Sequence, residues 1–235
     1  MMLKIGVPSK GRLMEKTFDW FGARGVAMGK AGDDREYSGR VEGVPGCELV
    51  LLSAGEIPRE LAAGRIHLGV TGTDLIREKL ADWPTQVAEV APLGFGFADL
   101  IIAVPVTWID VDTLDDLDAV AAQFRARHGQ RLRIATKYHR LVRDFLREAG
   151  VAEYQLVDSQ GATEGTVRNL TAEAVADITS SGETLRANHL KVLSDSVVLR
   201  SQAELFAARA APWGKAERAA LAALCARLGV AVPVV

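Results

Sequence analysis

A short run of hydroxyl and glycine residues late in the chain has the composition of a phosphate-binding loop. An apolar run ends at Ile178, and a helix is expected to begin near Glu183. The residues around this turn are small and polar, namely Thr179, Ser180, Ser181, Gly182 and Thr184. Hydroxyls and closely approachable backbone N–H groups at such a turn bind phosphate oxygens. The same residues also suit an ordinary helix cap, so the run alone leaves both interpretations open.

Two carboxylates accompany this loop. Asp177 lies directly before it, and Glu164 precedes Asp177 by thirteen residues. A carboxylate beside a phosphate site can accept hydrogen bonds from ribose hydroxyls or join the shell of a Mg²⁺ ion. Glu164 fits a surface turn nearly as well. Asp177 is the stronger candidate for binding ribose or a Mg²⁺-bound group.

Other charged and polar candidates also follow expected strands. Lys10 and Arg12 stand at the expected start of a helix, where basic charge opposes the helix dipole, which favours a ligand as the reason for their presence. Asp74 fits either a helix N-cap or a ligand contact. Lys137 and Tyr138 follow a strand as possible further contacts, although a tyrosine is more often a packing residue.

Short apolar runs alternate with amphipathic stretches along the chain. The expected strands are Leu3–Pro8, Glu48–Leu52, His67–Thr71, Leu100–Val104, Leu132–Ala135, Tyr154–Val157, Ala174–Ile178 and Val192–Leu199. The expected helices include Arg12–Phe21, Thr73–Leu80, Leu114–Arg127, Leu141–Ala149 and Ala216–Leu228. This order predicts an α/β fold built of βαβ units with mainly parallel sheets. Ligands of such folds bind beyond the carboxyl ends of the strands, where the candidate residues lie.

Composition excludes several classes of protein. The 235 residues carry 28 basic and 30 acidic side chains, a net charge of −2, which argues against a general nucleic-acid or membrane-surface binder. No run of about 18 apolar residues predicts a membrane span. Cys47 and Cys225 lie far apart without a disulfide pattern, so a reducing compartment and a cytoplasmic location are expected.

Two punctuated stretches predict a division into lobes. The first is Ala91–Phe97, rich in glycine and proline, and the second is Ser180–Asn188. We expect lobe I to contain residues 1–95 and 185–235, lobe II to contain residues 96–184 with the phosphate loop, and a cleft to separate them. Solute-binding proteins of the type II periplasmic class have this two-lobed architecture.

Several segments, in the same order along the chain, resemble the ATP phosphoribosyltransferases. The loop reads Asp-x-x-Ser-x-Gly-x-Thr-Leu from Asp177, and Glu164 has the spacing of that family's acidic pair. The other matching segments are Val7–Leu13, Gly64–Asp74, Arg133–Tyr138 and Leu185–Leu190. The resemblance covers nearly the whole chain. Departures include Ser53, where the family has Arg and for which Arg59 is a possible substitute, and His189, where it has Gly.

The resemblance implies a reaction in which adenine N1 of ATP attacks ribose C1 of 5-phosphoribosyl-1-pyrophosphate and pyrophosphate leaves. It implies that Thr179–Thr184, Glu183 included, bind the 5-phosphate, and that Asp177 and Glu164 bind ribose hydroxyls or the Mg²⁺ shell. Lys10 and Arg12 would face pyrophosphate or triphosphate, with no covalent nucleophile. Asp74 would meet adenine or a phosphate-bound metal. Lys137 and Tyr138 would add contacts.

The resemblance also predicts partners. Long members of the family carry a C-terminal regulatory domain, and short members work with a separate subunit resembling the catalytic domain of histidyl-tRNA synthetase. Because only Lys191–Val235 follows the phosphate loop and its helix, we expect the short form in a hetero-oligomer containing a homodimer of this chain.

Two other functions remain open at this point. A non-enzymatic two-lobed module that binds a small anion would share the fold, since fold alone does not decide function. An unrelated phosphate-binding transferase could share only the Asp177–Thr184 loop, but it would leave the other ordered matches to chance.

Overall fold

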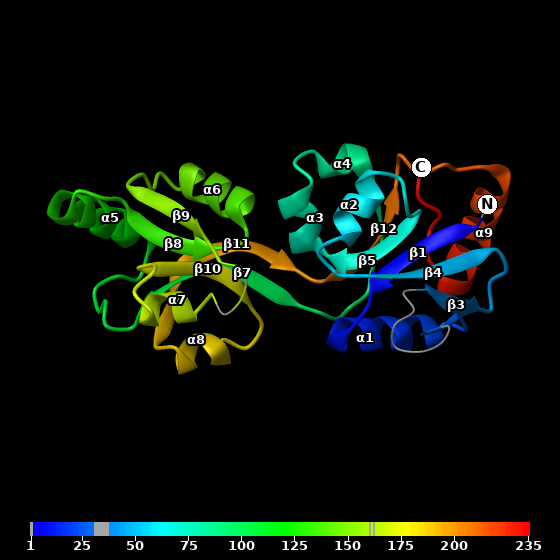
Figure 1. Ribbon diagram of the computed structural model, residues 1–235, viewed down its shortest axis with the longest axis horizontal. Coiled ribbons are helices and arrows are strands. Elements are labelled where there is room, and N and C mark those ends of the chain that lie inside the picture. Colours follow the sequence, from blue (N-terminus) through cyan, green and yellow to red (C-terminus); the bar gives the residue numbers. More distant parts are fainter. Residues whose placement is uncertain (1, 31–37, 160, 162) are drawn as a thin grey trace. The chain divides into compact units, whose positions relative to one another are not determined.

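The computed structural model describes residues 2–30, 38–159, 161 and 163–235. The chain divides into two compact units (Figure 1). Unit 1 comprises Met1–Gly96 and Gln202–Val235, and unit 2 comprises Phe97–Ser201. Each unit has its own sheet and its own helices, so each is described separately.

Unit 1 contains a seven-stranded sheet in the order β2-β3-β4-β1-β5-β12-β6. Its strands are β1 (Leu3–Pro8), β2 (Ala27–Lys30), β3 (Ser38–Glu42), β4 (Cys47–Leu52), β5 (Leu68–Gly72), β6 (Val87–Pro92) and β12 (Ala203–Ala208). β1 pairs in parallel with β4 and β5, whereas the other pairings of this sheet are antiparallel. The central position of β1 requires apolar side chains on both faces, and its burial is nearly continuous.

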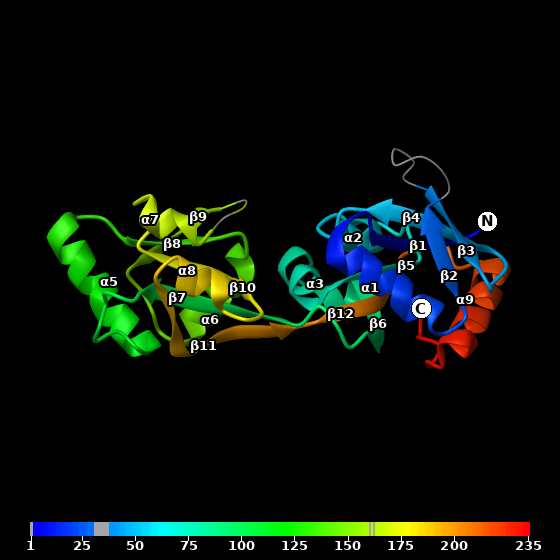
Figure 2. The same cartoon turned by 90° about the horizontal axis from the view of Figure 1, so that it is seen from below.

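Helices cover both faces of this sheet. They are α1 (Gly11–Gly22), α2 (Ile57–Ala62), α3 (Thr73–Lys79), α4 (Trp83–Gln86) and α9 (Lys215–Leu228). Leu205 of β12 belongs to the core under α1 and α9, and the next residue, Phe206, belongs to the core under α2 and α3. This alternation is the two-residue period of a strand. Figure 2, the view from below, shows α1 in front of the unit 1 sheet.

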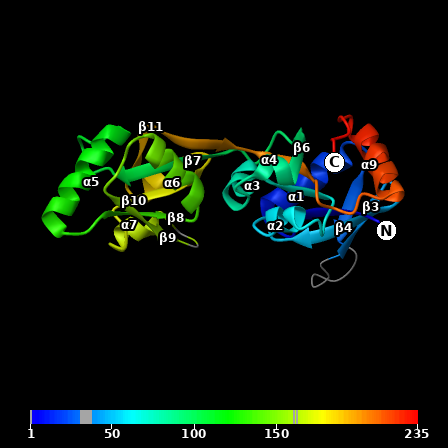
Figure 3. The ribbon, with the colours of Figure 1, turned by 90° about the horizontal axis from the view of Figure 1, so that it is seen from above.

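Unit 2 contains a five-stranded sheet in the order β11-β7-β10-β8-β9. Its strands are β7 (Ala98–Pro105), β8 (Leu132–Thr136), β9 (Tyr154–Asp158), β10 (Ala174–Thr179) and β11 (Leu190–Ser201). Its helices are α5 (Leu114–His128), α6 (His139–Glu148), α7 (Gly165–Arg168) and α8 (Glu183–Ala187). β8 pairs in parallel with β9 and β10, and β7 is antiparallel to β10 and β11. Figure 3, the view from above, shows α6 in front of this sheet.

The α/β class is confirmed, but the expectation of mainly parallel sheets is wrong. Parallel pairing is restricted to β4-β1-β5 and to β10-β8-β9, and antiparallel strands complete both sheets. The second lobe boundary also differs from the expected one. Residues 185–201 remain in unit 2, because β11 pairs with β7 through Ser201 and the chain enters unit 1 only at Gln202. The first boundary lies at Gly96, one residue beyond the expected position.

His189 has a backbone conformation that is unfavourable for its residue type. It follows α8 with φ of 55°, in the left-handed region where a Cβ atom is strained. This is the position where the resemblance predicts glycine. We therefore expect His189→Gly to raise the free energy of unfolding by about 0.5–1 kcal/mol. This value is the strain removed from the folded state minus the entropic cost of the greater conformational freedom that glycine gives the unfolded chain.

Urea unfolding checks this prediction, with Ala187→Gly as the matched control. Ala187 is the last residue of α8, where glycine should lower stability by about 0.5–1 kcal/mol. Equal losses for both variants would contradict the proposed relief of strain at His189.

Candidate functional site

A pocket opens in unit 2 where β10 extends beyond its neighbour. β10 pairs with β7 up to Thr179, but its pairing with β8 ends at Ala176. The last residues of β10 therefore have no strand partner on the β8 side. A pocket of about 190 Å³ lies at this end of the strand. Its lining residues are Glu164, Val175, Asp177, Ile178, Thr179, Ser180, Ser181, Glu183, Thr184 and Leu185.

Hydrogen bonds within the loop after β10 define its shape. Gly182 has φ of 72°, a left-handed conformation that glycine adopts without strain. Its N–H donates to Thr179 Oγ1 at 3.0 Å, and the N–H of Glu183 donates to Ser181 Oγ at 3.4 Å. A hydroxyl that accepts a hydrogen bond still has its own proton to donate. Thr179 and Ser181 can thus donate to an anion in the pocket.

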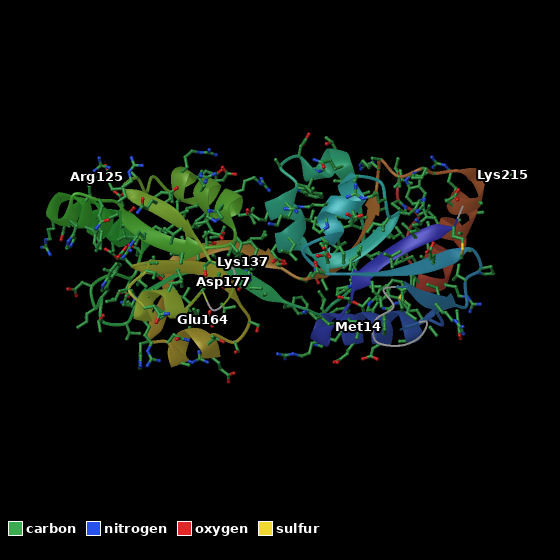
Figure 4. The ribbon with its side chains drawn as sticks, in the orientation of Figure 1. Met14, Arg125, Lys137, Glu164, Asp177 and Lys215 are labelled. Atoms are coloured by element: carbon green, nitrogen blue, oxygen red, sulfur yellow. The ribbon has the colours of Figure 1, made fainter. Side chains whose placement is uncertain are left out.

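The carboxylate of Asp177 lies between two donors. It accepts a hydrogen bond from the N–H of Ile178 at 2.8 Å, and its Oδ1 lies 3.4 Å from Nζ of Lys137. Nζ of Lys137 also lies 5.3 Å from the ring centroid of Tyr138. Figure 4 labels Lys137, Asp177 and Glu164, which lie near one another in unit 2. Acidic and basic groups therefore meet at the edge of a pocket rich in hydroxyls.

Most of the candidate residues of unit 2 meet at this pocket. The carboxylates of Asp177 and Glu164 line it together with the loop residues other than Gly182, and Lys137 contacts this lining through Asp177. Tyr138 is only 1% exposed, so its ring packs in the interior. Ile178 was expected as the buried end of a strand, but it is 39% exposed and lines the pocket. Only the pairing of β10 with its neighbours reveals this exposure.

The remaining candidates belong to unit 1. Lys10 precedes α1 in an extended conformation, and both it and Arg12 are exposed. Asp74 is in the first turn of α3 and is 6% exposed. The structure thus places these three residues in a different unit from the pocket.

A buried carboxyl that the sequence did not single out lies beside the start of α3. Glu204 of β12 is 9% exposed, and its Oε2 accepts a hydrogen bond from Thr73 Oγ1 at 3.2 Å. Burial raises the pKa of Glu204, and the nearby charge of Glu89 adds to this effect, although Thr73 and Arg77 oppose it. The only available signal was an acidic residue within the otherwise apolar run Ala203–Ala208.

The raised pKa of Glu204 predicts how stability depends on pH. A carboxyl whose folded-state pKa lies above its unfolded value favours folding when protonated, and that contribution is lost as the pH rises through the folded pKa. Glu204→Gln keeps the acceptor for Thr73 but carries no charge. We therefore expect this variant to be more stable than the parent chain at pH 8, with the difference shrinking towards pH 4.

Urea unfolding at several pH values measures this effect. Glu89→Gln is the control, because it removes a smaller contribution to the same pKa from an exposed position. A stability difference for Glu204→Gln that stayed constant with pH would show that its charge is not responsible.

The chain matches one family of enzymes over most of its length. The family model described as HisG: ATP phosphoribosyltransferase matches residues 53–229. An ATP phosphoribosyltransferase of Cereibacter sphaeroides is 78% identical over 233 residues, covering 99% of this chain and 98% of that protein. One from Mesorhizobium japonicum is 52% identical over 211 residues, covering 89% of this chain and 91% of that protein.

Solved structures show the same fold at low identity. The ATP phosphoribosyl transferase (HisG:HisZ) complex from Thermotoga maritima matches with a TM-score of 0.71 and 20% identity, over 97% of this chain and 96% of that chain. An extracellular-binding protein of a probable amino-acid transporter, from Bacillus subtilis, matches with a TM-score of 0.54 and 10% identity, over 97% and 91% of the two chains. The two-unit architecture is therefore shared by enzymes and binding proteins.

Among the described residues, none of the helices has both the length and the apolar character that a membrane span requires.

The family match extends across both units, and it includes the loop after β10 with its two carboxylates. Together with the relative that is 78% identical over nearly the full length of both proteins, this match shows that the chain belongs to the ATP phosphoribosyltransferases, the pentosyltransferases of histidine biosynthesis.

Proposed function

We propose that the unit 2 pocket binds the ribose 5-phosphate portion of 5-phosphoribosyl-1-pyrophosphate. The observation that carries this proposal is the lining of one small pocket by a hydroxyl-rich loop and two carboxylates. The loop suits phosphate oxygens, which accept hydrogen bonds from hydroxyl and N–H donors. The carboxylates suit ribose hydroxyls, which donate.

Within the loop, each hydroxyl has a defined task. Thr179 accepts from the N–H of Gly182, so its own proton is directed to the 5-phosphate. Ser180, Ser181 and Thr184 supply further donors from the lining of the same pocket. Because these donors are held by the fold before substrate arrives, little reorganisation opposes binding.

Asp177 and Glu164 then orient the sugar. Asp177 is held by the N–H of Ile178 and faces Lys137, which keeps its carboxylate in place for the ribose hydroxyls. Glu183 lines the pocket as a further polar contact. Lys137 is suited to the departing pyrophosphate, because an ammonium group on a flexible stem can move from one anion to another. Placement of adenine N1 against ribose C1 supplies most of the rate enhancement in this scheme.

Mg²⁺ fits this site as a companion of the substrate. The described residues contain no group of three or more His, Cys, Asp or Glu side chains that could hold a metal ion. Mg²⁺ commonly keeps several waters and binds through substrate phosphates with one or two carboxylates, a role open to Asp177 and Glu164. When bound, the ion neutralises charge that develops on the leaving pyrophosphate.

Unit 1 supplies the remaining groups in this proposal. Lys10 and Arg12 are exposed at the start of α1, where they can neutralise pyrophosphate or triphosphate oxygens. Asp74 at the start of α3 is assigned to adenine or to a phosphate-bound metal. Tyr138 is assigned a supporting role beneath Lys137, because its ring is buried and lies 5.3 Å from Nζ of Lys137.

The regulatory partner is also proposed. The similar structure from Thermotoga maritima is a HisG:HisZ complex, which supports a second subunit for this chain. We assign that subunit the histidyl-tRNA-synthetase-like class, in a hetero-oligomer containing a homodimer of this chain. Light scattering of the chain alone and of the chain with the subunit tests the proposed homodimer and the proposed hetero-oligomer.

The expected compartment has separate support. Cys47 and Cys225 are free and buried, which supports a reducing compartment such as the cytoplasm.

A binding experiment tests the assignment of the pocket. Thr184→Val removes one donor of the loop and keeps its shape, so it should weaken binding of phosphoribosyl pyrophosphate about tenfold and leave ATP binding unchanged. Calorimetric titration with each substrate measures the two affinities. If Thr184→Val leaves the affinity for phosphoribosyl pyrophosphate unchanged, the 5-phosphate binds elsewhere. A separate assay, the formation of phosphoribosyl-ATP with the regulatory subunit present, tests the overall activity.

A further inference from the structure

Arg186 of α8 lies against the phosphate loop but does not line the pocket. Its Nη2 donates to the carbonyl oxygen of Ser181 at 3.0 Å, and its backbone N–H donates to the carbonyl oxygen of Gly182, also at 3.0 Å. The proposed function gives this residue no task. Its two hydrogen bonds hold consecutive carbonyl groups of the loop.

These contacts fix one peptide group at both ends. The carbonyl of Ser181 and the N–H of Gly182 belong to the same planar peptide unit and point in opposite directions. Arg186 holds the oxygen, and Thr179 Oγ1 accepts from the N–H at 3.0 Å. The position of the guanidinium therefore determines which way the N–H points and, through it, how the hydroxyl of Thr179 is oriented.

This peptide group needs such an anchor because glycine can adopt several conformations. Gly182 has φ of 72°, and glycine reaches other backbone regions as readily. A flip of the peptide between Ser181 and Gly182 would turn a carbonyl oxygen towards Thr179. The hydroxyl of Thr179 would then donate its proton to that oxygen. It could no longer donate this proton to the phosphate.

The guanidinium also brings positive charge to the loop. Nη1 of Arg186 lies 3.0 Å, and Cζ 3.9 Å, from the place that a Cβ atom on Gly182 would occupy. The side chain is thus packed on the glycine while its outer face remains exposed. Arginine stays charged at every working pH and presents its donors in a rigid planar group, which suits a lasting anchor.

We propose that Arg186 is a positioning residue for the 5-phosphate: it locks the peptide between Ser181 and Gly182 in the orientation that leaves the proton of the Thr179 hydroxyl free for the substrate. This inference rests on the proposed function for its substrate. The locked peptide itself is a property of the free protein.

Hydrogen exchange of the full-length free protein tests the lock without any ligand. In Arg186→Ala the Gly182 amide should exchange at least tenfold faster than in the parent chain, while amides of β10 keep their rates. Arg127→Ala is the matched control, because Arg127 is an exposed arginine in the last turn of α5. Unchanged exchange at Gly182 in Arg186→Ala would overturn the inference.

Steady-state kinetics with the regulatory subunit present test the consequence. Arg186→Ala should raise KM for phosphoribosyl pyrophosphate about tenfold, the effect of one lost charge-assisted hydrogen bond, and leave KM for ATP and kcat within about twofold. Arg186→Lys, which keeps the charge but loses the planar group, should recover only part of the loss. A rise of both KM values together with lower thermal stability would indicate a merely structural role and contradict the inference.

If Arg186→Ala does not fold, a second variant, Arg186→Gln, provides the same test. Arg186→Gln keeps a planar donor on a shorter, neutral side chain and should give an intermediate exchange rate at Gly182. If the parent chain itself binds no phosphoribosyl pyrophosphate, the proposed function fails, while the exchange rate of Gly182 still decides whether Arg186 locks the loop.

Discussion

Replacing Asp177 with Asn is expected to lower kcat/KM for phosphoribosyl pyrophosphate about a hundredfold. In the proposed complex the carboxylate accepts hydrogen bonds from two ribose hydroxyls, each worth about 1.5 kcal/mol when the acceptor is charged. Asparagine turns one oxygen into a donor and also faces Lys137, which lies 3.4 Å from Asp177 Oδ1. Both changes oppose binding of the sugar. ATP affinity should stay within about twofold.

The matched control for this variant is Asp158→Asn. Asp158 is the last residue of β9 and pairs with His139, with 3.2 Å between Oδ1 and Nε2, but it does not line the pocket. Its replacement should leave kcat/KM within about twofold. Steady-state rates of phosphoribosyl-ATP formation, with the regulatory subunit present, measure both variants. Intact turnover and affinity in Asp177→Asn would show that the ribose binds elsewhere.

The parts of the fold that the sequence predicts are those with a strong local pattern. Apolar runs of four to six residues became β1, β4 and β8 with ends shifted by at most one residue. Asp112 and Thr113, which precede the expected helix Leu114–Arg127, are both residue types that cap helices, and Thr113 caps α5 in a capping box with Asp116. Capping depends on residues three apart, so the sequence shows it directly.

Elements whose existence depends on distant partners were missed. β12 has the sequence Ala-Glu-Leu-Phe-Ala-Ala, without the β-branched residues typical of strands. It is a strand because β5 and β6 pair with it on both sides. The same limit applies to the second lobe boundary, since β11 stays in unit 2 through its pairing with β7, which no local pattern reveals.

Predictability within the site follows the same division. The loop from Thr179 to Thr184 is one continuous segment, so its residues could be assigned together from composition. Lys137 approaches Asp177 because β8 and β10 are neighbouring parallel strands. The distance between the ammonium group and the carboxylate could be obtained only from the structure. Arg186 was part of a matching segment, but its contact with the Ser181 carbonyl depends on the turn at Gly182.

Gly64→Ala is expected to lower the free energy of unfolding by about 3 kcal/mol. Gly64 follows α2 in the left-handed conformation with φ of 67°, where a Cβ atom costs about 1 kcal/mol in strain. The added Cβ atom would also press on the carbonyl oxygen of Ala210. It would lie 2.8 Å from the carbonyl carbon of Ala210 and 3.0 Å from Cα of Ala211. Backbone atoms cannot move aside as a side chain does, so overpacking adds about 2 kcal/mol.

Gly229→Ala separates the two contributions. Gly229 is the C-cap of α9 in the same unit, has φ of 69°, and nothing lies within 4 Å of its added Cβ. This variant therefore meets only the conformational strain and should lose about 1 kcal/mol. Urea unfolding followed by circular dichroism gives both values.

The difference between the two losses measures the close approach of Gly64 to the segment after β12. That segment joins β12 to α9, so the contact ties the end of α2 to the part of the chain that returns from unit 2. Equal losses in the two variants would mean that the segment shifts freely and that the contact adds nothing to stability. A larger loss for Gly64→Ala would explain why glycine is required at this turn, because typical domains are stable by only about 5–15 kcal/mol.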